Sequence, residues 1–226
     1  MKVALYDLPR RLCAEALGSA LLLATVVGSG VMGERLSGGN VALALLANTL
    51  ATGAGLTAFI WMFGPISGAH FNPAVSLIAV LRRDLTWRAG SAYVAAQIVG
   101  AVAGVWTAHA MFGMAILEIS TKVRGGPAQM LSEFIAAFGL IGVILATARS
   151  RPDSTPMAVG LYITAAYWFT ASTAFANPAV TLARSLTDSF AGIAPANVAA
   201  FILAQVCGAL AAVSMFGWLL ENEAAR

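Results

Sequence analysis

The residues best able to recognise a small molecule occur in two copies of one triplet, Asn72-Pro73-Ala74 and Asn177-Pro178-Ala179, which lie 105 residues apart. Asparagine is a favoured helix N-cap, and proline is favoured at the first helical position because its missing N–H would be unpaired there. Each triplet therefore predicts the start of a short helix. Each asparagine amide could also donate hydrogen bonds to a solute, because capping uses its oxygen and donation uses its nitrogen.

The composition places both helix starts inside a membrane. Hydrophobic residues make up 59% of the chain and charged residues 10%, whereas soluble domains carry about 25% charged residues. The net charge of +3 is spread along the chain in groups of one to three cations, which excludes a nucleic-acid surface and leaves the lipid bilayer as the expected partner. A helix start at membrane depth is tolerated only where it is buried in protein or lines a water-filled cavity.

The apolar runs predict an all-α membrane protein with six transmembrane helices. The predicted spans are residues 12–32, 41–63, 92–112, 130–148, 157–169 and 198–220, of which the fifth is short. Gly64-Pro65 is expected to end the second span, and residues 115–127 form a polar connector. Each triplet opens a re-entrant segment, the first running to Leu81 and the second to about Leu186.

The chain is an internal repeat within a single channel domain, residues 1–226, with repeats at about 1–114 and 128–226. Each half keeps the order acid, triplet and Gln-x-x-Gly, carried by Glu15, Asn72, Gln97 and Gly100 and then by Glu133, Asn177, Gln205 and Gly208. Three spans per half is an odd number, so the second half must be inverted. Inverted repeats place a binding site at the membrane midplane, where broken helices meet.

The cations predict the orientation. If the N-terminus is cytoplasmic, the inside segments hold nine Lys and Arg residues and the outside segments hold four. This excess agrees with the positive-inside rule and places both termini in the cytoplasm.

These features resemble the aquaporin and aquaglyceroporin (major intrinsic protein) family over nearly the whole chain. The resemblance is carried by Ser67-Gly68-Ala69-His70-x-Asn72-Pro73-Ala74-Val75, Asn177-Pro178-Ala179, Glu15, Glu133 and the two Gln-x-x-Gly pairs. It implies six transmembrane helices, two half-helices that meet head to head at midplane, a pore in each protomer, a homotetramer and no cofactor. We expect an integral protein of a bacterial inner (plasma) membrane.

Two acids and two histidines have alternative interpretations. Glu15 and Glu133, each alone in an apolar run, could relay protons or could accept hydrogen bonds from the pore loops, and their symmetry and the family resemblance favour the second role. His70 resembles a loop histidine at the cytoplasmic vestibule and either lines the pore or ties the loop. His109 is interpreted as a span-end residue without a role.

The second triplet departs from the family pattern. The family usually has an arginine immediately after it, where this chain has Val180, and Arg184 lies four residues further on and is not an obvious substitute. By the same comparison, Thr52, Ala174 and either Tyr167 or Ala165 complete the selectivity filter. The constriction is therefore expected to be wider and less polar than in a water-selective pore, without a fixed positive charge.

We predict a passive channel for water and small uncharged solutes, such as glycerol-like polyols and neutral arsenite or antimonite. Arginine-free filters resemble those of bacterial metalloid-permeable aquaglyceroporins. The alternative is a proton-coupled secondary transporter of a small neutral solute that uses Glu15 and Glu133. An enzyme is not expected, because the sequence contains no nucleophile–base pair and no cluster of metal ligands.

Overall fold

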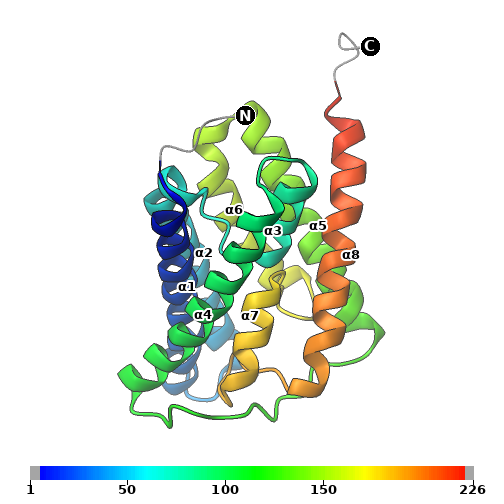
Figure 1. Cartoon of the computed structure of the whole chain (residues 1–226). Coiled ribbons are helices and arrows are strands. Elements are labelled where there is room, and N and C mark those ends of the chain that lie inside the picture. The colour runs from blue at the N-terminus through cyan, green and yellow to red at the C-terminus, as the bar shows by residue number, and fades with distance from the viewer. Residues whose placement is uncertain (1–5, 222–226) are drawn as a thin grey trace.

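A computed structural model describes residues 6–221, and in this part of the chain the regular elements are all helices, joined by loops, without strands (Figure 1). The long helices are α1 (Leu8–Leu36), α2 (Val41–Ser67), α4 (Trp87–Phe112), α5 (Pro127–Ser150), α6 (Thr155–Phe169) and α8 (Pro195–Leu219). The short ones are α3 (Pro73–Leu81), α7 (Pro178–Ala183) and the 3-10 turns η1 (Pro152–Ser154) and η2 (Arg184–Leu186). Five of the long helices are long and apolar enough to cross a membrane, and α6 extends about 22 Å.

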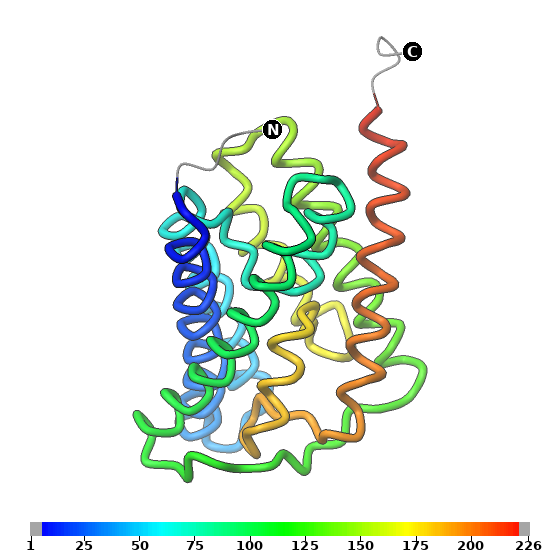
Figure 2. Tube along the Cα trace, viewed as in Figure 1, coloured from blue at the N-terminus to red at the C-terminus, as the bar shows by residue number. Residues whose placement is uncertain are grey.

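The arrangement is the predicted inverted repeat. Helices α1, α2 and α4 belong to the first half, and α5, α6 and α8 take the equivalent places in the second (Figure 2). The short helices α3 and α7 lie between the halves and extend toward opposite ends of the molecule (Figure 1). The start of α1 and the end of α8 lie at the same end. The predicted fold, with six long helices and two half-helices, is confirmed.

One predicted boundary is wrong, because the Gly64-Pro65 pair does not end the second span. Helix α2 continues through Pro65 to Ser67 and ends at Gly68, whose φ of 90° is left-handed and whose N–H donates to the Gly64 carbonyl at 3.0 Å. A proline inside a helix loses one backbone hydrogen bond. In the last turns this loss interrupts little of the helix, so α2 carries the chain deeper before the loop begins.

Glycines bring equivalent helices into backbone contact. A Cβ placed on Gly100 in α4 would lie 2.1 Å from the Ala16 carbonyl oxygen in α1, and one on Gly208 in α8 would lie 2.2 Å from that of Phe134 in α5. Such distances exclude any side chain at either position. Ala16 and Phe134 directly follow the buried acids Glu15 and Glu133. Because the glutamine of each Gln-x-x-Gly motif lies about one helical turn from its glycine, this close approach of the helices brings the glutamine beside the carboxylate.

This packing predicts the effect of adding one methyl group to α8. We expect Gly208→Ala to lower the free energy of unfolding by about 1–3 kcal/mol, because the Phe134 carbonyl blocks the new Cβ. Gly217→Ala is the matched control in the same helix, since no atom lies within 4 Å of its Cβ position. Thermal unfolding of both variants in detergent micelles measures the difference. Equal melting temperatures would contradict the close approach of α5 and α8.

Candidate functional site

Glu15 holds the loop that precedes the first triplet. Its carboxylate is fully buried and accepts from the backbone N–H groups of His70 (3.0 Å) and Phe71 (2.7 Å). It also accepts from the Ser67 hydroxyl at 2.6 Å and from Gln97 Nε2 at 2.7 Å. This one carboxylate therefore accepts hydrogen bonds from the loop, from the C-terminal end of α2, and from α4.

Glu133 does the same in the second half. It is also fully buried and accepts from the backbone N–H groups of Phe175 and Ala176, each at 2.9 Å. Gln205 Nε2 donates to it at 2.5 Å. Both acids thus accept from two consecutive loop N–H groups and from the glutamine of a Gln-x-x-Gly motif, and Glu15 accepts from a hydroxyl as well.

Both loops contain left-handed backbone at residues other than glycine. Phe71 and Ala176 have φ values of 48° and 49°, and Ala69 and Ala174 have 50° and 46°. This conformation costs roughly 1–2 kcal/mol per residue outside glycine. It also turns consecutive N–H groups toward the glutamates, so the hydrogen bonds to these carboxylates offset the strain and fix the loops.

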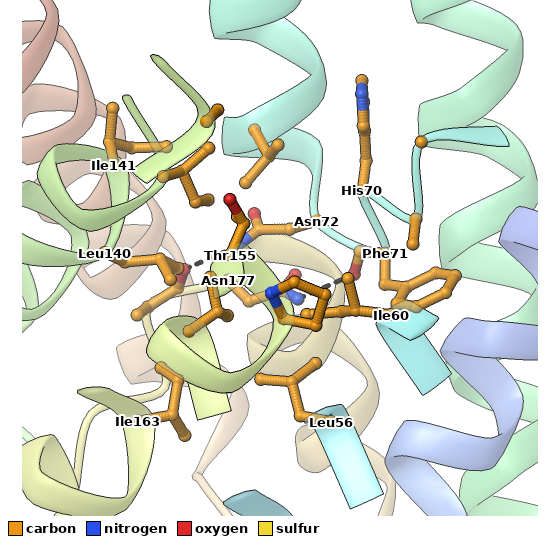
Figure 3. Close-up of a pocket in the computed structure, with 18 of the residues that line it drawn as sticks. Leu56, Ile60, His70, Phe71, Asn72, Leu140, Ile141, Thr155, Ile163 and Asn177 are labelled. Carbon is orange, nitrogen blue, oxygen red and sulfur yellow. Dashed lines mark hydrogen bonds between the residues drawn. The ribbon is translucent and has the colours of Figure 1, made fainter. Parts of the chain in front are cut away.

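The triplets join the two halves through reciprocal hydrogen bonds (Figure 3). Asn72 caps α3 by accepting from the Ala74 N–H at 2.9 Å, and Asn177 caps α7 by accepting from the Ala179 N–H at 3.0 Å. The amide nitrogens reach across: Asn72 Nδ2 donates to the Ala176 carbonyl and Asn177 Nδ2 donates to the Phe71 carbonyl, both at 2.8 Å. Each amide nitrogen carries a second hydrogen that these bonds leave available.

A cavity of about 980 Å³ passes both asparagines. Its wall is mostly aliphatic, as Figure 3 shows for Leu56, Leu140 and Ile163 around the two amides. His70 and the two asparagines add polar atoms, whereas neither Glu15 nor Glu133 lines the cavity. The arrangement provides a continuous apolar path with a few fixed hydrogen-bond donors near its middle.

All four positions predicted for the filter line this cavity. Thr52, Ala174 and Val180 are buried along it, and Tyr167 lies opposite Thr52 with 3.5 Å between their hydroxyl oxygens. Ala165 is exposed on the outer surface of α6, so geometry favours Tyr167 over Ala165. The cavity wall also includes Arg184, which the sequence comparison had set aside.

The two histidines have defined contacts. His70 both lines the cavity and ties its loop, with Nδ1 3.0 Å from the Ser76 hydroxyl. His109 lies near the end of α4, as expected, but it is fully buried, and its Nε2 lies 2.8 Å from the Thr187 hydroxyl. The interpretation that His109 has no role is therefore wrong, because it anchors the loop that follows η2. The hydrophobic pattern of the sequence could not predict this contact, because Thr187 lies 78 residues further along the chain.

Within residues 6–221 no group of three or more His, Cys, Asp and Glu side chains is placed to hold a metal ion. Around the two asparagines the cavity wall is mostly apolar with a few donors and hydroxyls, and charged side chains also line it: Arg82, Asp84, Arg149, Asp153 and Arg184. Such a wall suits passage of small neutral molecules, because it offers hydrogen bonds without holding a solute tightly.

Comparisons with known proteins agree with this geometry. A sequence model of the major intrinsic protein family matches residues 2–171. Aquaglyceroporin AqpS of Rhizobium meliloti (strain 1021) is 56% identical over 216 residues, covering 96% of this chain and 92% of that protein. Aquaporin NIP1-1 of Oryza sativa subsp. japonica is 31% identical over 209 residues, covering 89% of this chain and 71% of that protein.

Among solved structures, the aquaglyceroporin from Plasmodium falciparum shares the fold, with a TM-score of 0.73 at 19% identity, covering 93% of this chain and 96% of the other. The family and the fold predicted from the triplets and the repeat are confirmed by these matches. The chain therefore belongs to the major intrinsic protein family, and it is a membrane channel for water and small solutes rather than an enzyme.

Proposed function

We propose that the chain conducts small uncharged hydroxylated solutes, namely glycerol-like polyols and neutral arsenite or antimonite, together with water, by passive flow. The observation that carries this proposal is the cavity that passes both asparagine amides between aliphatic walls. The relative from Rhizobium meliloti is named an aquaglyceroporin, which supports a polyol as one solute.

The mechanism follows from the two helix starts. Helices α3 and α7 both begin at the middle of the cavity, and a helix N-terminus carries up to about half a positive charge. Cations, including a hydrated proton, meet a barrier there. A neutral solute is instead oriented by the free N–H of Asn72 and of Asn177, which accept no proton and donate to its oxygen. Pro73 and Pro178 set the geometry of these starts.

The contacts of the acids favour a supporting role over proton coupling. Glu15 and Glu133 are buried and do not line the cavity; Glu15 accepts from N–H groups and one hydroxyl, and Glu133 accepts from N–H groups. A proton relay needs a carboxyl that exchanges protons with the solute path, and neither acid is placed for that exchange.

The same proposal includes a homotetramer in a bacterial inner (plasma) membrane, with both termini cytoplasmic. Large apolar side chains exposed on the long helices, such as Leu50, Trp61 and Leu203, suit lipid or neighbouring protomers. Among the cations expected inside, Arg10 and Arg11 lie at the start of α1, Arg82 and Arg83 directly after α3, Arg88 at the start of α4, and Arg149 and Arg151 at the end of α5. Among those expected outside, Arg35 lies at the end of α1, Lys122 and Arg124 lie between α4 and α5, and Arg184 lies directly after α7. Lys2 and Arg226, also counted as cytoplasmic, lie outside the described residues.

Passive flow predicts a specific kinetic behaviour in proteoliposomes. We expect swelling rates with glycerol and uptake of arsenite to rise linearly with the solute gradient and to be insensitive to a protonophore, because no step requires proton movement. Stopped-flow light scattering and a metalloid uptake assay make the measurement, with empty liposomes as the control. Flux that saturates, or that collapses when the protonophore is added, would support the transporter instead.

The supporting role of the acids predicts that Glu133→Gln acts on stability. The amide would present an NH₂ group to at least one N–H donor, and an unsatisfied buried group costs about 1–3 kcal/mol. We expect a lower melting temperature in micelles with passive glycerol flux retained in the protein that inserts. Glu34→Gln, at an exposed position of α1, is the control. An unchanged melting temperature together with lost flux would favour the relay interpretation.

The filter geometry predicts the effect of Val180→Arg. A long cation added to the cavity wall should narrow the passage, so glycerol and arsenite flux fall by about tenfold or more while water flux falls less. Stopped-flow rates at equal protein per vesicle give the ratios. Val180→Leu, which adds volume without charge, separates narrowing from charge. An unchanged glycerol-to-water ratio in Val180→Arg would show that Val180 is not at the constriction.

A further inference from the structure

Arg184 is a buried cation on the wall of the solute path. Its side chain is 2% exposed, and it lines the same cavity as Thr52, Tyr167 and Val180. It follows Val180 by four residues, which is about one helical turn. Helix α7 ends at Ala183 and continues into η2, and both Val180 and Arg184 line the cavity.

The guanidinium is held in place from two sides. Its central carbon lies 3.3 Å from the centroid of the Phe175 ring, and Nε donates to the Ala191 carbonyl. The backbone is fixed as well, since the Arg184 carbonyl accepts from the Ile193 N–H at 3.2 Å. An aromatic face attracts a cation electrostatically while leaving the edge of the guanidinium open.

The outer edge of this guanidinium has no protein partner. Among the described residues neither Nη1 nor Nη2 makes a hydrogen bond, and no ion pair includes Arg184. Neither terminal nitrogen is a fully buried atom without a partner, and Arg184 lines the cavity, so both nitrogens are accessible from the cavity. A buried charge without a counter-ion is costly unless other groups solvate it. Water or solute in the cavity must therefore provide the remaining hydrogen bonds.

We propose that Arg184 is the specificity-determining cation of the outer constriction and donates from its two terminal nitrogens to oxygen atoms of passing neutral hydroxylated solutes. This inference deepens the proposed function and rests on it. The planar fork of donors suits two neighbouring oxygens, as in a vicinal diol or a hydroxide of a metalloid. The fixed charge adds to the barrier against cations, which the sequence comparison assigned to no residue of this filter.

Arg124 allows a purely structural role to be separated from this one. Its guanidinium also lies over Phe175, at 5.2 Å, but its Nε and Nη1 donate to the carbonyls of Gly192 and Ser172. Arg124 does not line the cavity. Loss of Arg124 therefore removes a cation that supports the same loop without changing the wall of the solute path.

The test compares Arg184→Met, Arg184→Lys and the control Arg124→Met in proteoliposomes at equal protein per vesicle. Water and glycerol flux are measured by stopped-flow light scattering, and proton leak is followed with an internal pH dye under an imposed potassium diffusion potential. We expect Arg184→Met to raise proton leak by about tenfold, which corresponds to about 1.4 kcal/mol, because a fixed cation in a narrow path repels a passing proton. Arg124→Met should match the parent.

Arg184→Lys separates charge from geometry. It should keep proton leak near that of the parent but shift the glycerol-to-water ratio, since an ammonium lacks the planar pair of donors. If Arg184→Met does not insert, an unchanged ratio in Arg184→Lys overturns the inference and a shifted ratio supports it. If Arg184→Met inserts and its leak and ratio equal those of the parent, the inference fails while the channel function stands. A parent without water or glycerol flux overturns both.

Discussion

The structure depends on the pairing of backbone N–H groups where the chain stops being helical at the centre of a bilayer. No bulk water reaches that depth in lipid, so each unpaired group would cost several kcal/mol. Glu15 and Glu133 meet this requirement, each accepting from two consecutive N–H groups of a loop. The left-handed residues beside them are stable only while these carboxylates hold them. The ends of α3 and α7, the asparagine amides and the cavity wall all take their positions from these two loops.

Close helix packing makes that pairing possible. Gly100 and Gly208 let α4 and α8 approach α1 and α5 to backbone contact, which brings Gln97 and Gln205 to the acids. In each Gln-x-x-Gly motif the glycine therefore permits the close approach of two helices, and the glutamine donates the hydrogen bond to the acid. An acid in an apolar span is tolerated in this protein because its charge is satisfied by neighbours rather than by solvent.

Much of the fold and of the site could be predicted from the sequence, because the repeat, the triplets and the apolar spans are local patterns. Features that depend on contacts between segments distant in the sequence could not be predicted from these local patterns. Pro65 is an ordinary helix breaker by composition, yet it lies so near the C-terminus of α2 that one lost hydrogen bond does not stop the helix. Arg184 and His109 were set aside by spacing alone. Their positions depend on Phe175, Ala191 and Thr187, contacts that form only when separate segments pack together.

The reciprocal bonds from Asn72 to the Ala176 carbonyl and from Asn177 to the Phe71 carbonyl join residues 104 and 106 positions apart. During synthesis the first loop is complete long before its partner has left the ribosome. For that interval it must wait in the membrane with its amide and carbonyl unpaired across the midplane, held only by Glu15 and its own half. The meeting of the two triplets is therefore a late event, because it cannot occur before α5, α6 and the second loop have been made.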